Sequence, residues 1–296
     1  MSGGFDWWLL FEIGLAGLGT GGLYALTGLA FVMIYKATRV VNIAIGEMLM
    51  IGAYLFFAFS AGMGLPVWLA IPGALLASGV FGALVERTMI RPMLGESPIA
   101  SFMVMVGLAS ILVGAVELIW TADQQRLPEF FPNKHVPIGE AMVAPKIFYG
   151  FWIAVALIAT VLVVFRFWRG GVALRATAAD QAAAVSMGID VPRVFSLTWT
   201  FAAMIAGVAG IVVGSIGGIS SAMGVFGLSV LVVVIFGGLD SVLGALVGGL
   251  IVGVIEALAG FYLGGEFKIL ATFSLLLLIL LVRPYGLFGT HEIERL

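Results

Sequence analysis

The chain has 296 residues, of which 62% are hydrophobic and only 10% charged, and its mean hydropathy is +1.18. Soluble domains carry about 25% charged residues, so this composition excludes a soluble globular protein and predicts that a lipid bilayer is the solvent. The net charge of −2 is close to neutral, and the lack of any cysteine excludes disulfides, thiolate catalysis and cysteine-ligated metal sites.

A spanning helix needs roughly 20 mostly apolar residues, and, taken in chain order, the apolar stretches give eight candidates. They are Leu9–Tyr35, Ile43–Ala61, Val67–Val85, Ile99–Trp120, Phe148–Phe165, Phe195–Ile219, Val242–Leu263 and Ile269–Val282. A shorter run, Phe226–Phe236, ends at the sequence GGLDS of residues 237–241, which predicts a broken or re-entrant helix. We therefore expect an all-α, polytopic integral membrane helical bundle of about eight (seven to nine) spans, in one transmembrane domain over residues 1–296.

Basic residues predict the orientation of the bundle, because they are enriched in cytoplasmic loops. Ten of the 14 basic residues can be placed together on the cytoplasmic side of the predicted spans: Lys36, Arg39, Arg87, Arg91, Arg166, Arg169, Arg175, Arg193, Arg283 and Arg295. The N-terminus is then outside and the C-terminus inside, which requires an odd number of crossings. Eight is even, so either the run at 226–236 also crosses or one span is misassigned. Residues 121–147, with four prolines, are predicted to form an external loop, either a landing site for a soluble partner or a plain connection.

A break in the hydrophobicity at residues 166–195 predicts a cytoplasmic loop. It holds an alanine-rich helical stretch, Thr177–Met187, which Gly188 is expected to end in a left-handed conformation. A short helix held outside the lipid suits the docking of a separate motor subunit on the cytoplasmic side. The arginines that flank this stretch are Arg166, Arg169, Arg175 and Arg193.

Polar groups inside spans are costly, so each is a functional candidate. Asn42 and Glu47 are five residues apart and would lie on different faces of a regular helix, but a break near Gly46 would bring them together. Asp240 lies in the break at 237–241, and Glu256 is the lone acid deep in the seventh span. We hypothesise that these four polar side chains line a translocation path. An interhelical hydrogen bond is the alternative for Asn42, Glu47 and Glu256.

The sequence offers no catalytic, metal or nucleotide site of its own. His135 and His291 both fall in polar segments, which makes an intramembrane metal site improbable. The glycine-rich stretch GLGTGG at 17–22 follows no strand and precedes no Walker-type Lys-Ser/Thr pair. Glycines four apart, such as Gly210 and Gly214, instead predict close helix packing. We therefore expect a transport subunit without enzymatic activity or cofactor, and any ATP is hydrolysed by another chain.

Four blocks of sequence, taken together and in order, are specific. They are IYKATRVVNIAIGEMLMIGAY (Ile34–Tyr54), GGVALRATAADQAAAVSMGIDVPRV (Gly170–Val194), VIFGGLDSVLGALVGGLIVGVIEAL (Val234–Leu258) and RPYGLFGTHEIERL (Arg283–Leu296). Along nearly the whole chain, these blocks resemble the permeases of branched-chain amino acid ABC importers, the LivH-type family. The second block resembles the cytoplasmic coupling loop of that family, and the fourth is similar to its C-terminal tail.

The resemblance implies how the loop at 166–195 contacts an ATPase. The general coupling motif of importers is Glu-Ala-Ala, three residues and Gly. Here Ala182, Ala183, Ala184 and Gly188 keep that spacing, with alanine in place of the motif's glutamate and Asp180 two residues earlier. The residues implied to couple to the ATPase are Arg175, Asp180, Ala183, Ala184 and Gly188.

The resemblance also implies a division of labour among several chains. This chain would form the translocation path together with a second homologous permease, while two ABC ATPase subunits drive it and a periplasmic solute-binding protein delivers the solute. The assembly would lie in the inner membrane of a bacterium and import branched-chain or related small amino acids, without binding nucleic acid. The sequence does not select among these solutes, amides, urea and small aromatic acids.

An ion-coupled secondary transporter of small solutes is the alternative function. Glu47 and Glu256 would then bind the coupling ion, and a broken helix suits such a carrier. This alternative leaves the loop helix at 177–188 unexplained.

Overall fold

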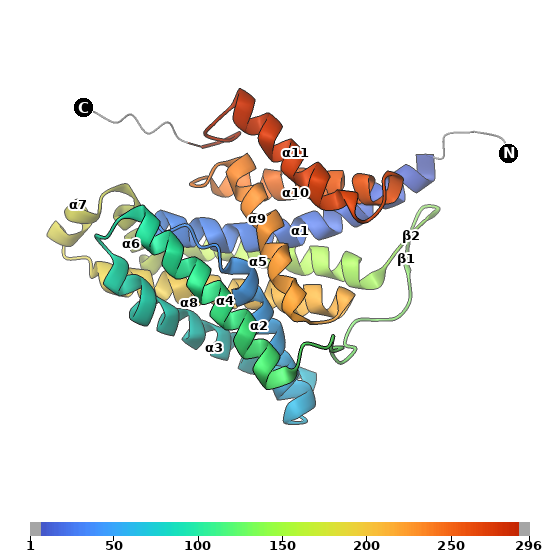
Figure 1. Cartoon of the computed structure of the whole chain (residues 1–296), viewed down its shortest axis with the longest axis horizontal. Helices are drawn as coiled ribbons and strands as arrows, with labels where there is room; N and C mark the ends of the chain where they lie inside the picture. Colours follow the sequence, from blue (N-terminus) through green and yellow to red (C-terminus); the bar gives the residue numbers. More distant parts are fainter. Residues whose placement is uncertain (1–6, 290–296) are drawn as a thin grey trace.

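The structure, a computed structural model, describes residues 7–289 and is mostly helical (Figure 1). Within these residues, seven helices are long and apolar enough to cross a membrane. They are α1 (Trp7–Thr38), α2 (Ile45–Phe57, continued to Gly62), α3 (Val67–Val85), α4 (Pro98–Trp120), α5 (Pro145–Phe167), α8 (Val191–Gly217) and α10 (Val242–Tyr262). The predicted all-α, polytopic bundle is confirmed, at the lower bound of the expected span count.

Shorter elements connect or extend these helices. A π-helical turn, Ala58–Gly62, continues α2, and a second one, Glu86–Ile90, continues α3 into the 3-10 turn Arg91–Met93. Strands β1 (Val136–Ile138) and β2 (Ala141–Val143) pair antiparallel between α4 and α5. The remaining helices are α6 (Arg169–Ala179), α7 (Gln181–Ser186), the 3-10 turn Ser221–Met223, α9 (Gly224–Gly237) and α11 (Phe267–Val282).

The structure describes only part of the predicted C-terminal block, and it describes both predicted loops, 121–147 and 166–195. The part of the C-terminal block beyond residue 289, with His291 and Arg295, lies outside the described residues. The segment predicted to be external, 121–147, is tied to the end of α8, since Gln125 and Ile219 exchange two backbone hydrogen bonds of 2.9 and 2.8 Å. Its place outside the membrane, and that of 166–195 inside the cell, remain predictions.

The predicted broken helix is confirmed at α9, which has only 14 residues. Gly238 turns the chain with φ +109°, a conformation that side chains disfavour, and α10 begins four residues later. The carbonyls at the end of α9 are not left without partners, because Leu287 N–H donates to Phe236 and Phe288 N–H to Gly237, both at 2.9 Å. The segment after α11 therefore caps the broken helix.

The eighth predicted span, Ile269–Val282, is helical throughout, as part of the 16-residue α11. This helix is shorter than the seven that are long enough to span, so its crossing of the membrane stays a prediction. One prediction about helix boundaries was wrong. The single loop helix predicted over Thr177–Met187 is instead two helices, α6 and α7. The chain is extended at Asp180 (φ −157°, ψ 112°), whose carboxylate caps the second helix, and an aspartate there favours a new helix start over an unbroken one.

Helix α1 is the centre of the bundle, and most of its length is buried. Its most extensive partner is α10, with α5, α8 and α9 packed around it. Glycines make the contact between α1 and α10 close: a Cβ on Gly21 would lie 2.8 Å from the carbonyl oxygen of Gly249, and one on Gly17 would lie 2.7 Å from the Cα of Val254. The glycines predicted to pack helices therefore bring two backbones into contact.

We expect Gly21→Leu to destabilise the protein by about 1–3 kcal/mol, because the added side chain would push α10 away from α1. The thermal unfolding midpoint of the purified protein in detergent measures this loss. Gly14→Leu is the matched control on the same helix, since a Cβ there meets nothing within 4 Å. Equal stability of the two variants would show that the α1–α10 contact is looser than described.

Candidate functional site

Two helices begin against each other near the centre of the view in Figure 1: α2 and the short helix α9. Gly46, in the first turn of α2, meets the first turn of α9, and a Cβ on it would lie 2.5 Å from the carbonyl oxygen of Gly224 and 2.8 Å from the Cα of Gly227. The chain is not helical over residues 39–44, so the interruption precedes Gly46 and Gly46 itself is helical. Glycine is required here because two backbones touch.

Glu47 is the ionisable side chain at this junction. Its Oε1 faces the first residue of α9, 2.6 Å from where a Cβ on Gly224 would lie. Its Oε2 is buried and has no hydrogen-bond partner among the described residues. The partial positive charge at the start of α9 favours a carboxylate at this position. Glu47 therefore offers a buried acceptor to a ligand.

Asn42 lies in the non-helical segment that precedes α2 and is completely buried. Its Nδ2 lies 3.2 Å from the Sδ of Met48, a weak acceptor, and its Oδ1 has no partner within the described part of the chain. A buried polar atom without a partner costs about 1–3 kcal/mol. Asn42 is thus a second acceptor near the start of α2 that the fold leaves unused.

Sequence reasoning missed two further polar side chains in the core. Tyr54 is seven residues after Glu47, hence on the same face of α2 and about 10 Å further along it. Its buried hydroxyl has no partner among residues 7–289, and neither has the indole N–H of Trp199 on α8. The available signal was a polar aromatic side chain in an otherwise apolar span.

Glu256, by contrast, is fully engaged. The hydroxyl of Tyr24 donates to Oε2 at 2.5 Å, and Ser229 and Thr272 donate to Oε1 at 3.0 and 2.6 Å. These three donors come from α1, α9 and α11, so one carboxylate on α10 joins four helices. Between the two interpretations of Glu256, its contacts favour the interhelical hydrogen bond.

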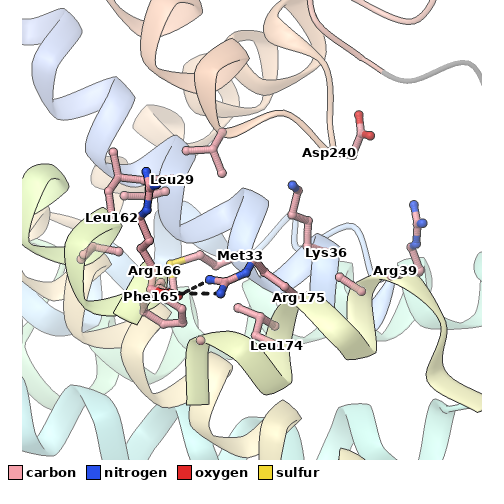
Figure 2. Close-up of a pocket in the computed structure, with 15 residues that line it drawn as sticks. Leu29, Met33, Lys36, Arg39, Leu162, Phe165, Arg166, Leu174, Arg175 and Asp240 are labelled. Atoms are coloured by element: carbon pink, nitrogen blue, oxygen red, sulfur yellow. Dashed lines mark hydrogen bonds between the residues drawn. The ribbon is translucent and has the colours of Figure 1, made fainter. Parts of the chain in front are cut away.

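Asp240 lies at the opposite end of α9 from Glu47. It follows the helix in the turn before α10, and the 14 residues of α9 separate the two carboxylates by about 20 Å. With Lys36 and Arg39 it lines a pocket between α1, α5 and α6 (Figure 2). The structure therefore does not bring the four predicted path residues into one site.

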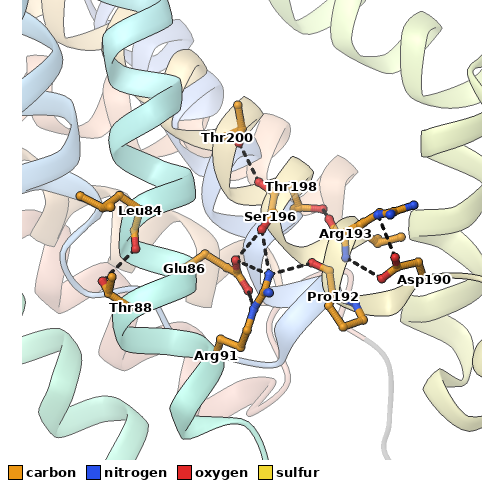
Figure 3. A network of polar contacts seen from close by, with 11 residues as sticks. Leu84, Glu86, Thr88, Arg91, Asp190, Pro192, Arg193, Ser196, Thr198 and Thr200 are labelled. Carbon is orange, nitrogen blue, oxygen red and sulfur yellow. Dashed lines mark hydrogen bonds and ion pairs between the residues drawn. The ribbon is translucent and has the colours of Figure 1, made fainter.

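An ion pair between a buried carboxylate and a partly exposed arginine lies where the loop that follows α5 joins α8. Glu86 is completely buried and accepts hydrogen bonds from Arg91 Nε at 3.1 Å, Arg91 Nη2 at 2.9 Å and the hydroxyl of Ser196 at 2.6 Å (Figure 3). The same guanidinium donates to the carbonyl of Pro192 at 3.2 Å. Glu86 thus pairs with Arg91 and not with its neighbour Arg87, and the network joins the end of α3 to the first turns of α8.

Both ends of α7 are capped by the residues that the sequence singled out. The carboxylate of Asp180 accepts from the N–H of Ala183 at 3.0 Å. At the other end Gly188 has φ +82°, and the N–H groups of Gly188 and Ile189 donate to the carbonyls of Val185 and Ala184, at 2.9 and 3.0 Å. This is a Schellman motif, so the expected left-handed end at Gly188 is present.

Of the other three predicted coupling residues, Ala184 and Arg175 contact the bundle, and Ala183 is exposed. Ala184 is buried in a small apolar cluster with Ala37, Leu174 and Phe195. The guanidinium of Arg175 donates to the carbonyls of Phe165 and Arg166 in the last turn of α5, as Figure 2 shows. Ala184 and Arg175 therefore hold α6 and α7 against the spans.

The opposite face of α7 is exposed and apolar. Val185 is 60% exposed and Met187 83%, and Ala182 and Ala183 are exposed beside them. Figure 1 shows α7 projecting at one end of the bundle, with the β1–β2 hairpin at the other. Single exposed apolar residues are common, but an apolar face on a capped projecting helix is typical of a docking surface.

Known permease proteins are similar to this chain over almost its whole length. The sequence model of a family described as "Branched-chain amino acid transport system / permease component" matches residues 13–283. The high-affinity branched-chain amino acid transport system permease proteins LivH of Escherichia coli K12 and of Salmonella typhimurium are each 32% identical over 293 residues, covering 94% of this chain and 95% of the relative. BraD of Pseudomonas aeruginosa is 31% identical over 295 residues with the same coverage. The solved structure "PsaBC from Streptococcus pneumoniae in complex with Fab" has a TM-score of 0.52 at 12% identity and covers 91% of each chain, which shows a shared fold.

We expect Tyr24→Phe to lower the stability of the protein by about 1.5–3 kcal/mol, because it removes one hydrogen bond to the Glu256 carboxylate. Thermal unfolding in detergent measures the loss, and Tyr262→Phe on exposed α10 surface is the matched control. Solute uptake per folded molecule should not change in either variant. A loss of uptake at unchanged stability would contradict the structural role and return Glu256 to the path.

Proposed function

Because the chain belongs to the family of branched-chain amino acid transport system permeases, we propose that it is the permease subunit of an ATP-binding-cassette importer. It is a multi-pass membrane protein, and a transport subunit of this kind leaves ATP hydrolysis to partner chains. The solute we propose is a branched-chain or related small amino acid, since LivH and BraD are permeases of branched-chain amino acid transport systems. The membrane is the inner membrane of a bacterial cell.

The observation that carries this proposal is the exposed apolar face of α7. The helix has only six residues, too few to persist without tertiary contacts, yet it is capped at both ends and fixed through Ala184. An ATPase that grips Val185 and Met187 would therefore move a rigid element. The Glu86–Arg91–Ser196 network carries such a motion into α3 and α8.

The solute path that we propose runs along one face of α2. Glu47 and Tyr54 lie two turns apart on that face, and each has a buried polar atom without a partner among the described residues. Buried polar atoms are nearly always paired in folded proteins, so two on one helix face mark a place where a ligand supplies the partner. The α-ammonium group of an amino acid is a donor that suits Glu47 and the oxygen of Asn42.

The partners follow from the same proposal. Two ATPase subunits would bind α7 and the corresponding helix of a second homologous permease, which would complete the path. A periplasmic solute-binding protein would deliver the amino acid.

Purification of the tagged chain from mild detergent, with identification of the proteins that accompany it, tests this composition. Recovery of an ATPase and a second permease supports it, and an unaccompanied chain that transports under an ion gradient without ATP supports the secondary-carrier alternative.

We expect Val185→Asp combined with Met187→Asp to reduce the amount of ATPase that copurifies with the chain by about tenfold or more, because two charges would enter an apolar contact. Quantitative immunoblotting of the purified complex measures this. Met63→Asp, on a methionine that is 67% exposed elsewhere, is the matched control and should retain the ATPase. Full ATPase recovery and ATP-dependent uptake with the altered α7 would refute its role in coupling.

We expect Glu47→Gln to lower ATP-dependent amino acid uptake by about tenfold or more, since a hydrogen bond to a charged group is worth about 1.5–3 kcal/mol. Uptake into proteoliposomes of the assembled importer is the measurement, normalised to folded protein. Glu266→Gln, on an exposed carboxylate that precedes α11, should transport normally. Unchanged uptake in the Glu47 variant would exclude this carboxylate from the path.

A further inference from the structure

A pocket of about 730 Å³ lies at the end of the bundle that carries α6, between α1, α5, α6 and the start of α10 (Figure 2). Its volume is in the range of small-molecule sites. Neither the transport path nor the α7 face uses it: Glu47 and Tyr54 are not among its lining residues, and α7 contributes none. What the pocket can hold follows from the chemistry of its wall and rim.

The wall of the pocket is apolar and extends towards the interior of the spans. Leu29 and Met33 on α1 face Leu162 and Phe165 on α5. From Leu29 to Lys36, at the rim, α1 rises about 10 Å. Leu162, an apolar residue of the predicted span α5, is 39% exposed, so protein does not enclose the pocket completely on that side. A wall of this kind suits a hydrocarbon chain that enters from the lipid.

The rim of the pocket is strongly basic. Lys36, Arg166 and Arg175 come from the last turns of α1 and α5 and from α6, and Arg39 and Asp240 lie further along the rim (Figure 2). Within residues 7–289, neither Lys36 nor Arg166 forms an ion pair. Arg175 is held in place by its bonds to the carbonyls of Phe165 and Arg166. Fixed or unpaired cations around a rim attract a phosphate.

From these observations, we propose that the pocket binds an anionic phospholipid of the surrounding bilayer. The phosphate lies among Lys36, Arg166 and Arg175, and part of one acyl chain lies along Leu29 and Leu162. Charge complementarity favours this occupant, because a zwitterionic headgroup would leave the rim with an excess of positive charge. A helix of a second protein is a poorer fit, since it would bury the unpaired cations of Lys36 and Arg166. The bound lipid would brace α6, and with it the loop that carries α7.

Lipid binding to the purified full-length chain in detergent tests the proposal. Native mass spectrometry is used to titrate phosphatidylglycerol and, separately, phosphatidylcholine of the same acyl chains. We expect phosphatidylglycerol to bind more tightly, and Lys36→Gln combined with Arg166→Gln to weaken it about 30-fold. The matched control is Arg87→Gln combined with Arg169→Gln, which removes two exposed cations that do not line the pocket. The control should bind phosphatidylglycerol as the unaltered chain does.

Three outcomes would overturn the proposal. Equal weakening in the control would mean that the attraction is a general effect of surface charge. Displacement of the lipid by soluble glycerophosphoglycerol at equal concentration would mean that the rim binds a free phosphate and that the apolar wall contributes nothing. Loss of the lipid when the chain is assembled with its partner subunits would mean that the pocket is a protein interface. Retention of the lipid in that assembly, with none of the other results, supports the site.

Discussion

The close contact between α1 and α10 is the constraint on which the rest of the bundle depends. In a bilayer, two apolar helices gain nothing by leaving lipid for each other unless their backbones approach closely, and Gly17 and Gly21 allow this against α10. Together with α5, α8 and α9, which pack around the rest of the helix, this contact buries most of α1. It also brings Tyr24 within reach of Glu256, whose carboxylate then ties in the two short helices α9 and α11.

Buried polar side chains among the described residues fall into two groups: those that are hydrogen-bonded to other helices, and those with a polar atom that has no partner. Glu86 and Glu256 are buried but each accepts at least three hydrogen bonds, so their cost of burial is offset and they serve as joints between helices. Glu47, Asn42 and Tyr54 keep an unused polar atom where α2 meets α9 or along α2. The unpaired carboxylate oxygen of Glu47, where the other two buried carboxylates are paired, is the basis for our proposal that a polar solute binds along α2.

In the function that we propose, an ATPase subunit acts on the solute path through the loop between α5 and α8. Asp180 and Gly188 fix α7 as a short rigid piece, Ala184 anchors it, and the ion pair of Glu86 with Arg91 connects the following helix to α3. If an ATPase binds the exposed face of α7 as we propose, these contacts would transmit its movement to α3 and α8. The basic pocket beneath α6 adds a point at which the membrane itself would act on the same element.

The sequence alone determined the class, the broken helix and the helix end at Gly188. Apolar runs of sufficient length predict spans because the bilayer thickness sets a minimum, and the GGLDS sequence at 237–241 predicts a break because glycine and a capping serine end and restart helices locally. Gly188 as a helix end was predictable for the same local reason. Only the tertiary structure decided that Glu256 is paired while Glu47 is not, that Ala184 faces inward, and that Asp240 lies about 20 Å from Glu47. Caps and spans depend on neighbours along the chain, whereas the partner of a buried carboxylate comes from helices up to 232 residues away, and no local pattern encodes which of them will meet it.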